Sequence, residues 1–183
     1  MTRVLIVCQR VPWPLDDGHA LRALELVRHA APDIECHLAC LPSRLEGFAG
    51  LREQDVFVSE AVLPSRDSKR HWRRFFRFGV RDYQRHAFPQ QYAAATRQLQ
   101  EIVERHAIEV VVAFMHRSEE LVRPVRGVAK LVDNYDCFTL AHERRLQAMA
   151  ASASWLERLR VMRHVAEARS IEAGLGERCD LIT

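Results

Sequence analysis

Residues 3–8, RVLIVC, and residues 11–18, VPWPLDDG, set the pattern that decides the fold. The first stretch is a short, continuous apolar run with β-branched residues, which is typical of a strand buried on both faces of a parallel sheet. Pro12 and Pro14 keep the second stretch from being helical, and apolar residues then recur at helical spacing from Gly18 to Ala31. The chain therefore begins with a predicted strand, a loop and a helix.

The same alternation of apolar runs and amphipathic stretches continues along the chain. Further strands are predicted at residues 35–41, 56–63, 109–115 and 129–133, and a sixth strand begins at residue 179. Helices are predicted at residues 45–54, 89–106, 118–122, 138–150 and 154–173. Alternating strands and helices of these lengths indicate a parallel sheet with helices on both faces, because crossovers between parallel strands are almost always right-handed. We expect a Rossmann-like, doubly wound α/β fold with strand order 3-2-1-4-5-6.

Length and composition fit one soluble globular domain. A chain of 183 residues with 48% hydrophobic content can bury one good core, so we expect a single domain over residues 1–183. No apolar run approaches the roughly 20 residues that a transmembrane helix needs, and the N-terminus lacks the long apolar region of a secretory signal. These features predict a cytoplasmic protein.

The cysteines give no sign of a metal site or a disulfide framework. They are Cys8, Cys36, Cys40, Cys137 and Cys179. Their number is odd, and they form neither a C-x-x-C pair nor the histidine-interleaved spacing of zinc sites. We expect buried, reduced thiols and no bound metal.

The positive charge is concentrated in one segment. The net charge is +3, but residues 66–85 contain eight basic residues and two aspartates, a local balance of +6. This segment interrupts the α/β pattern between Pro64 and Phe88, so we interpret residues 64–88 as an insertion in which arginines alternate with aromatic residues. Its central residues are Arg70, Trp72, Arg73, Arg74, Phe75 and Phe76. Such a pattern favours an anionic membrane surface or acceptor; the alternative is a helix whose aromatic side chains fold onto the sheet.

Three separated stretches carry a resemblance to a known family. They are residues 4–30, VLIVCQRVPWPLDDGHALRALELVRHA; residues 130–146, KLVDNYDCFTLAHERRL; and residues 172–183, in which Glu172 stands eight residues before Asp180 and Leu-Ile-Thr follows. In order and spacing they resemble the N-terminal domain of glycosyltransferase family 4-like enzymes, most closely the sugar transferases of bacterial exopolysaccharide clusters.

The resemblance implies an acceptor-side N-terminal half of a GT-B fold, with the C-terminal donor-binding domain absent, so the chain alone is expected to be inactive. It implies a hexosyltransferase of surface polysaccharide or glycoconjugate synthesis that uses a nucleotide sugar and a glycan or lipid-linked acceptor. Family members retain anomeric configuration and generally need no metal or other cofactor. Peripheral attachment to the inner face of the cell membrane would follow for lipid-linked acceptors.

The loop after the first strand is one part of the predicted site, since ligands of open α/β sheets bind outside the carboxyl ends of the strands. Gly18 stands where this loop enters its helix, after Asp17, and Arg22 follows one turn further in. Helix N-termini favour anions and glycine permits close approach, so we predict that these three residues bind substrate. The alternative is that Gly18 only relieves a tight turn and Arg22 pairs with Asp16, Asp17 or Glu25.

The loops after the fourth and fifth strands complete the predicted site. His116 and Arg117 follow the fourth strand, and Asp133 and Asp136 end the fifth. We predict catalytic roles for His116, which can exchange a proton near neutral pH, and for Asp133, and substrate binding for Arg117 and Asp136. The alternatives are a histidine that caps backbone carbonyls and an Asp136 that caps the next helix.

Other function classes fit the sequence less well. Arginines alternating with aromatic residues also suit single-stranded nucleic acid, but the basic residues are local and no nucleic-acid-binding motif accompanies them, so this is the alternative function and not the main one. The first loop lacks the glycines of an NAD-binding fingerprint. A receiver-type signalling domain would need an acidic cluster where Cys8, Gln9 and Arg10 stand.

Overall fold

A computed structural model of the chain describes residues 1–42, 46–64, 82–134, 137–149 and 153–182. Its strands are β1 (Thr2–Cys8), β2 (Ile34–Cys40), β3 (Ser59–Val62), β4 (Val110–Phe114), β5 (Ala129–Asp133) and β6 (Leu181–Ile182). Its helices are α1 (Gly18–Arg28), α2 (Gly47–Arg52), α4 (Tyr83–Ala87), α5 (Pro89–Arg105), α6 (His116–Val122), α7 (Phe138–Ala148), α8 (Trp155–Glu172) and α9 (Leu175–Arg178).

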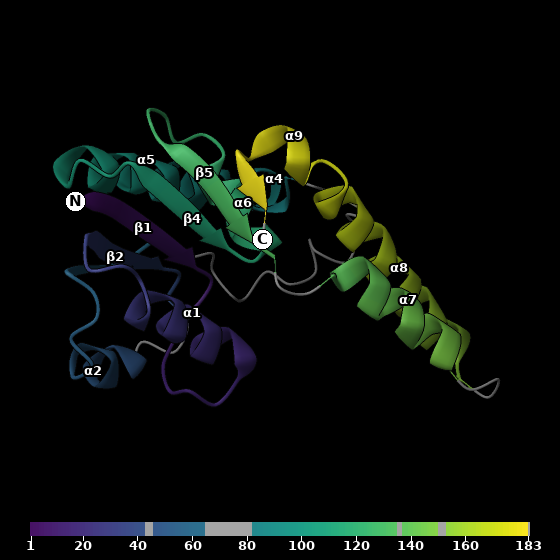
Figure 1. Cartoon of the computed structure of the whole chain (residues 1–183). Coiled ribbons are helices and arrows are strands. Elements are labelled where there is room, and N and C mark those ends of the chain that lie inside the picture. The colour runs from purple at the N-terminus through teal and green to yellow at the C-terminus, as the bar shows by residue number, and fades with distance from the viewer. Residues whose placement is uncertain (43–45, 65–81, 135–136, 150–152, 183) are drawn as a thin grey trace.

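The six strands form one sheet in the order β3-β2-β1-β4-β5-β6, and every neighbouring pair is parallel. The fold is therefore a Rossmann-like α/β fold, which confirms the predicted class and strand order. Because the strands are parallel, their carboxyl ends meet at one edge of the sheet (Figure 1). At that edge Cys8 lies beside Cys40 and Phe114 beside Asp133.

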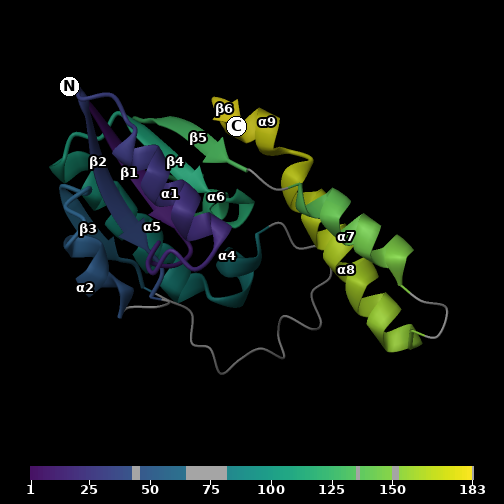
Figure 2. The ribbon, with the colours of Figure 1, turned by 60° about the horizontal axis from the view of Figure 1, so that its bottom comes forward.

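Helices cover both faces of the sheet, with α5 and α6 on one face and α1 and α2 on the other (Figures 1 and 2). The alternation along β1 explains this arrangement. Leu5 and Val7 pack into the cluster that includes α5, whereas Ile6 and Cys8 pack into the cluster that includes α1. Successive side chains of a strand point to opposite faces, so a strand that is apolar throughout needs helices on both.

Local sequence signals place most helix ends within a few residues of the prediction. Asp17 caps α1 by accepting a hydrogen bond from the backbone N–H of Ala20 at 3.0 Å. Pro89 occupies the first turn of α5, where its missing N–H costs nothing. Two short helices, α4 and α9, were not predicted. Both are shorter than the window over which apolar periodicity can be recognised.

The loop after β1 is held by close packing against α2. A Cβ atom at Gly47 would lie 2.4 Å from the carbonyl oxygen of Trp13, and one at Gly50 would lie 2.2 Å from the indole nitrogen of Trp13. Only glycine fits at either position in this arrangement. These two glycines therefore let Trp13 settle against α2, and this fixes the loop that leads into α1.

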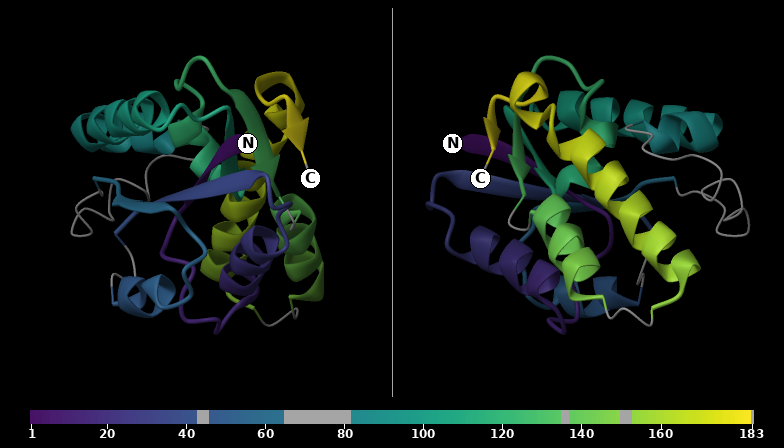
Figure 3. Two further views of the ribbon diagram at one scale, coloured as in Figure 1. Left: turned by 60° about the vertical axis from the view of Figure 1, so that its left-hand side comes forward. Right: turned by 90° about the vertical axis from the view of Figure 1, so that its right-hand side faces the viewer.

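Helices α7 and α8 form a hairpin that leaves the sheet at the edge where the strands end (Figures 1 and 3). The second helix begins with a capping box, in which Ser154 and Glu157 satisfy each other's backbone N–H groups. No residue of α7 is buried, and α8 buries only one side. Within the described residues, no helix is both long enough and apolar enough to cross a bilayer.

Candidate functional site

Two of the predicted site residues form an ion pair at the carboxyl edge of the sheet. The Nε and Nη2 atoms of Arg22, on α1, donate to Oδ2 and Oδ1 of Asp133, at the end of β5, and both distances are 2.9 Å. This is the bidentate geometry in which a guanidinium binds a carboxylate most strongly. The structure thus joins the first and fifth strand loops, although the two residues are 111 positions apart.

Burial differs sharply between the two partners. The Asp133 side chain is 1% exposed, and the Arg22 side chain is 44% exposed. A buried carboxylate therefore fixes a guanidinium that remains in contact with solvent. The alternative to substrate binding was that Arg22 pairs with Asp16, Asp17 or Glu25. The structure shows a pair with Asp133, which ends β5, two strands from β1 in the sheet.

The N-terminus of α1 lies beside this pair, one helical turn from Arg22. Asp17 caps the helix, and its second oxygen, Oδ2, lies 2.5 Å from Nη2 of Arg10. Gly18 is the first helical residue, and a Cβ atom there would meet nothing within 4 Å. Packing within the described residues therefore does not require glycine at this position, and the space that a Cβ atom of Gly18 would occupy is open.

The turn after β4 holds Met115 in an unusual backbone conformation, with φ 70° and ψ 148°. This region is populated almost only by glycine, and a residue held there costs about 1–3 kcal/mol. The turn is fixed by hydrogen bonds from the Met115 N–H to the Asp133 carbonyl (2.9 Å) and from the Ser118 hydroxyl to the Phe114 carbonyl (2.8 Å). His116 begins α6 immediately after this turn, so its backbone lies at the predicted edge.

The Arg117 side chain contacts the α7–α8 hairpin. Its Nη2 atom lies 3.8 Å from Oε1 of Glu167, on α8. The structure therefore links Arg117 to the base of the α7–α8 hairpin, next to the stacked rings of His142 and His164, whose centroids are 5.3 Å apart. Burial, and after it the charge of Arg117, lowers the pKa of His142 below its ordinary value.

Two thiols and a histidine, which were not predicted to lie together, are close to one another beneath the edge. Cys8 and Cys40 are register partners at the ends of β1 and β2, and both are fully buried. A hydrogen bond from the Cys40 thiol lowers the pKa of Cys8, and His19 and Arg10 lower it further, against the effect of burial. Burial raises the pKa of Cys40. The signal available in the sequence was that both cysteines end neighbouring strands.

The expectation of buried reduced thiols holds for part of the set. All five cysteines are free, with Cys8, Cys36 and Cys40 buried, Cys137 exposed and Cys179 half-buried. In the described part of the chain, no three histidine, cysteine or acidic side chains are grouped so that they could hold a metal ion.

Two buried glutamates, Glu119 and Glu120, lie on α6, below the edge. Glu119 accepts from Arg123 at 2.7 Å and from Arg178 at 3.1 Å, and this joins α6 to the segment before β6. Glu120 accepts from the backbone N–H of Arg85 at 2.8 Å, and burial raises its pKa to about 7. These contacts join α4 and α9 to α6, so we assign them a structural role.

Several predicted site residues lie outside the described residues. These are Asp136 and the patch Arg70, Trp72, Arg73, Arg74, Phe75 and Phe76. The same holds for the side chain of His116. The nucleic-acid alternative depends on the same segment, of which residues 65–81 are outside the described ranges.

No protein-family model matches this sequence, and no curated protein matches it. The edge itself brings together a fixed guanidinium, the start of an eleven-residue helix and open space in front of Gly18. Helix N-termini and guanidinium groups both attract anions, and phosphate groups above all. The arrangement therefore favours a phosphate-bearing ligand at the ends of β1 and β5.

Proposed function

We propose that this chain is the acceptor-side N-terminal domain of a glycosyltransferase, and that the carboxyl edge of its sheet forms one wall of the sugar-transfer cleft. The observation that carries the proposal is the Arg22–Asp133 ion pair beside the N-terminus of α1. The donor of such an enzyme is a nucleoside diphosphate sugar. Its diphosphate would match a fixed guanidinium that lies one helical turn from a helix N-terminus.

In this proposal Arg22 binds the diphosphate and Asp133 positions Arg22. Both Asp133 oxygens accept hydrogen bonds from the guanidinium, so we favour a positioning role over the catalytic role that the sequence suggested. Negative charge grows on the leaving diphosphate as the bond from the sugar's anomeric carbon to oxygen breaks. A cation that is already fixed stabilises this charge without reorganising, which is how electrostatic catalysis lowers a barrier.

Gly18 and His116 take the remaining roles at the edge. The open space at Gly18 would let a phosphate oxygen approach the backbone N–H groups at the start of α1. His116 would donate to, or accept a proton from, a sugar hydroxyl. The strained Met115 just before it supports this assignment, because such conformations cluster at functional sites.

The parent enzyme would work in the cytoplasm, at the inner face of the cell membrane, on a glycan or lipid-linked acceptor. It would use no metal or other cofactor. A donor-binding domain outside this chain would hold most of the nucleotide sugar, so the chain alone should bind the donor weakly and transfer no sugar.

Calorimetric titration of UDP-glucose, GDP-mannose and inorganic diphosphate into the chain tests the binding part of the proposal. We expect weak binding of at least one nucleotide sugar and of diphosphate. Arg22→Gln should weaken it at least tenfold, because hydrogen bonds to charged groups contribute about 1.5–3 kcal/mol. Arg28→Gln is the matched control, since Arg28 lies on the same helix and pairs only with neighbours on the surface. Equal affinities for the two variants would refute the assignment of Arg22.

Sugar transfer itself needs a longer polypeptide that contains this chain and a donor-binding domain. With radiolabelled nucleotide sugars and polyprenyl phosphate acceptors, we expect transfer, and we expect Arg22→Gln to lower kcat more than tenfold. Binding by the edge without any transfer, over a broad panel of donors, would leave an anion-binding domain and disprove the transferase.

A further inference from the structure

The outer side of the α7–α8 hairpin carries a stripe of exposed apolar side chains. Trp155, Leu159 and Met162 are 71%, 42% and 54% exposed and follow one another at spacings of four and three residues, so they lie on one side of α8. Leu156 borders them and is 55% exposed. The buried residues of α8, which begin with Val161, lie on the opposite side. We call Trp155, Leu156, Leu159 and Met162 the hairpin stripe.

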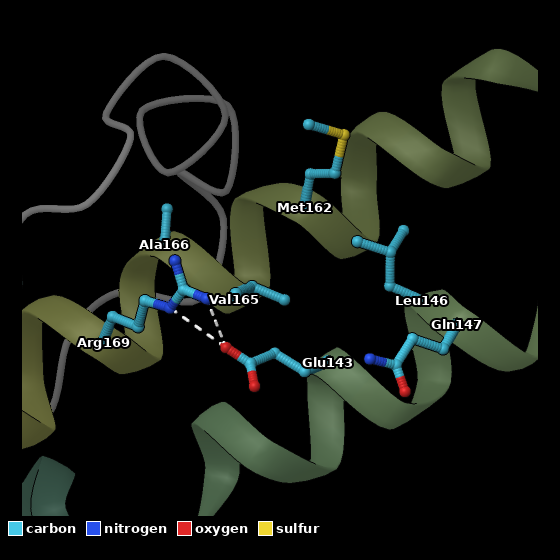
Figure 4. Close-up of a pocket in the computed structure, with 7 residues that line it drawn as sticks. All are labelled: Glu143, Leu146, Gln147, Met162, Val165, Ala166 and Arg169. Carbon is cyan, nitrogen blue, oxygen red and sulfur yellow. Dashed lines mark hydrogen bonds and ion pairs between the residues drawn. The ribbon is translucent and has the colours of Figure 1, made fainter.

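A groove continues the stripe toward the base of the hairpin. It lies between α7 and α8, has a volume of about 450 Å³ and is lined by Leu146, Met162, Val165 and Ala166, among others (Figure 4). An ion pair between Glu143 and Arg169 borders it. The hairpin thus offers an apolar surface that is continuous from Trp155 into the space between its helices.

Positive charge surrounds this apolar surface. Between residues 144 and 163 the chain has five arginines, and its one acidic residue, Glu157, is engaged in the capping box at the start of α8. Helical spacing places Arg158 on one side of the stripe and Arg160 on the other. Arg163 lies within the stripe, between Leu159 and Leu156. Exposed apolar side chains next to arginines suit the boundary between lipid headgroups and acyl chains, where buried apolar area and attraction to anionic lipid both contribute to binding.

We propose that the hairpin stripe docks on an anionic lipid surface, with its apolar side chains in the headgroup boundary and its arginines on lipid phosphates. Tryptophan and arginine are the residues that membrane interfaces favour, because the first has an apolar body with a polar edge and the second attracts anionic lipid. The hairpin leaves the sheet at the edge where the strands end, so docking holds that edge near the membrane (Figure 1). The proposal stands on the hairpin alone, whatever the edge of the sheet binds.

Cosedimentation with vesicles is the first test. The chain should bind phosphatidylglycerol vesicles and leave phosphatidylcholine vesicles in the supernatant. Trp155→Ser combined with Leu159→Ser should weaken binding at least tenfold. Arg160→Gln combined with Arg163→Gln should weaken it about 25-fold, since each arginine near an anionic surface contributes about fivefold. Hairpin variants that bind as well as the unchanged chain would overturn the proposal.

Matched controls lie on the sheet and its flanking helices, residues 1–134, which we call the sheet domain. Val58→Ser removes an apolar side chain that is equally exposed, and Arg97→Gln combined with Arg105→Gln removes two exposed charges from α5. These variants should bind vesicles within about twofold of the unchanged chain. Circular dichroism melts should show that every variant is folded, because all of the substituted side chains are exposed or half-exposed.

Fluorescence identifies the side chain that enters the lipid. Brominated phosphatidylglycerol should quench the tryptophan emission of the bound chain, and Trp155→Phe should bind equally well but lose most of the quenching. Quenching of the same size in Trp155→Phe and in the unchanged chain would show that Trp155 stays outside the lipid and would overturn the proposal. Sedimentation velocity gives the remaining outcome: a dimer that Trp155→Ser and Leu159→Ser dissociate, without vesicle binding, would assign the stripe to a second copy of the chain instead.

Discussion

The sheet domain and the α7–α8 hairpin differ in how far they bury their apolar side chains. In the sheet domain, apolar residues of strands and helices form two buried clusters, one on each face of the sheet. In the hairpin, α7 buries no residue, and the largest side chains of α8 point to solvent. Both regions have similar helix lengths, so the contrast comes from what each helix packs against.

The contrast shows where the free energy of unfolding of this chain originates. Helices in proteins are stabilised mainly by packing of an apolar face, and only the sheet provides such a surface on both sides. The side chains of the hairpin stripe are exposed, and we propose that they contact lipid. Changes in the sheet domain should therefore alter stability, and changes in the hairpin stripe should alter binding.

The largest expected effect comes from removing a core side chain. Leu99 is fully buried between α5 and the sheet, so Leu99→Ala should lower the free energy of unfolding by about 3 kcal/mol. Leu159→Ala, in the stripe, should change it by less than about 0.5 kcal/mol. Urea unfolding followed by circular dichroism measures both. A comparable loss in the two variants would mean that the hairpin belongs to the folding core, and the comparison would fail.

The second effect is a pH dependence from the buried Glu120. Burial raises its pKa in the folded chain to about 7 from the ordinary value of 4.5, so the folded state binds a proton more tightly than the unfolded state. Stability is therefore highest below pH 4.5 as far as this group is concerned, falls as pH rises to about 7, and is constant above it. The loss should total about 3 kcal/mol.

Glu120→Gln should remove this slope and stabilise the chain at pH 8, because glutamine still accepts from the Arg85 N–H. The hairpin has a glutamate whose pKa is shifted in the opposite direction. Hydrogen bonds from Ser154 lower the pKa of Glu157, so Glu157→Gln should matter at neutral pH and lose its effect in acid. Thermal melts of both variants between pH 4 and pH 8 measure this; identical pH profiles for Glu120→Gln and the unchanged chain would contradict the burial of Glu120.

A third effect tests the packing of the loop after β1. Gly50→Ala places a methyl group 2.2 Å from the Trp13 indole nitrogen and should cost about 2 kcal/mol, through strain or displacement of the loop. Gly176→Ala, in α9, meets nothing within 4 Å and should instead stabilise the chain by about 0.5–1 kcal/mol. Chemical denaturation distinguishes them, and equal effects would show that Trp13 does not lie against α2.

The last and smallest pair of effects on stability compares an ion pair at the candidate site with one on the hairpin. Arg22→Gln should cost about 1 kcal/mol, because glutamine keeps one donor for Asp133 and water reaches the half-exposed position. On the hairpin, Arg169→Gln removes a more exposed partner of Glu143 and should cost less than about 0.5 kcal/mol. A large loss of stability in Arg22→Gln would mark the ion pair as a structural contact, and the functional assignment would weaken.

The strands were the most predictable part of the fold. The run from Ala129 to Asp133 was predicted with the bounds that the structure has, because the apolar pair Leu131 and Val132 stands directly before Asp133 and the acidic loop that follows it. Strand order followed from the alternation of strands and helices. The edge of the sheet could be named as the site for the same reason, since parallel strands bring their following loops together.

The contacts at that edge could not be predicted from the sequence. The pairing of Arg22 with Asp133 depends on how α1 lies over β4 and β5, and sequence neighbours of Arg22 offered three closer carboxylates. The strain at Met115 has no signature in residue type, because methionine rarely adopts a positive φ. The hairpin stripe was hidden as well, since exposed and buried faces of α8 are both apolar and only packing tells them apart.

Backbone amide chemical-shift mapping with UDP-glucose and GDP-mannose locates the bound ligand on the fold. We expect concentration-dependent shifts for Gly18 to Arg22, for His116 and for Asp133, with the hairpin amides unchanged. Shifts that avoid this edge, or their absence with every nucleotide sugar and with diphosphate, would contradict the proposed site.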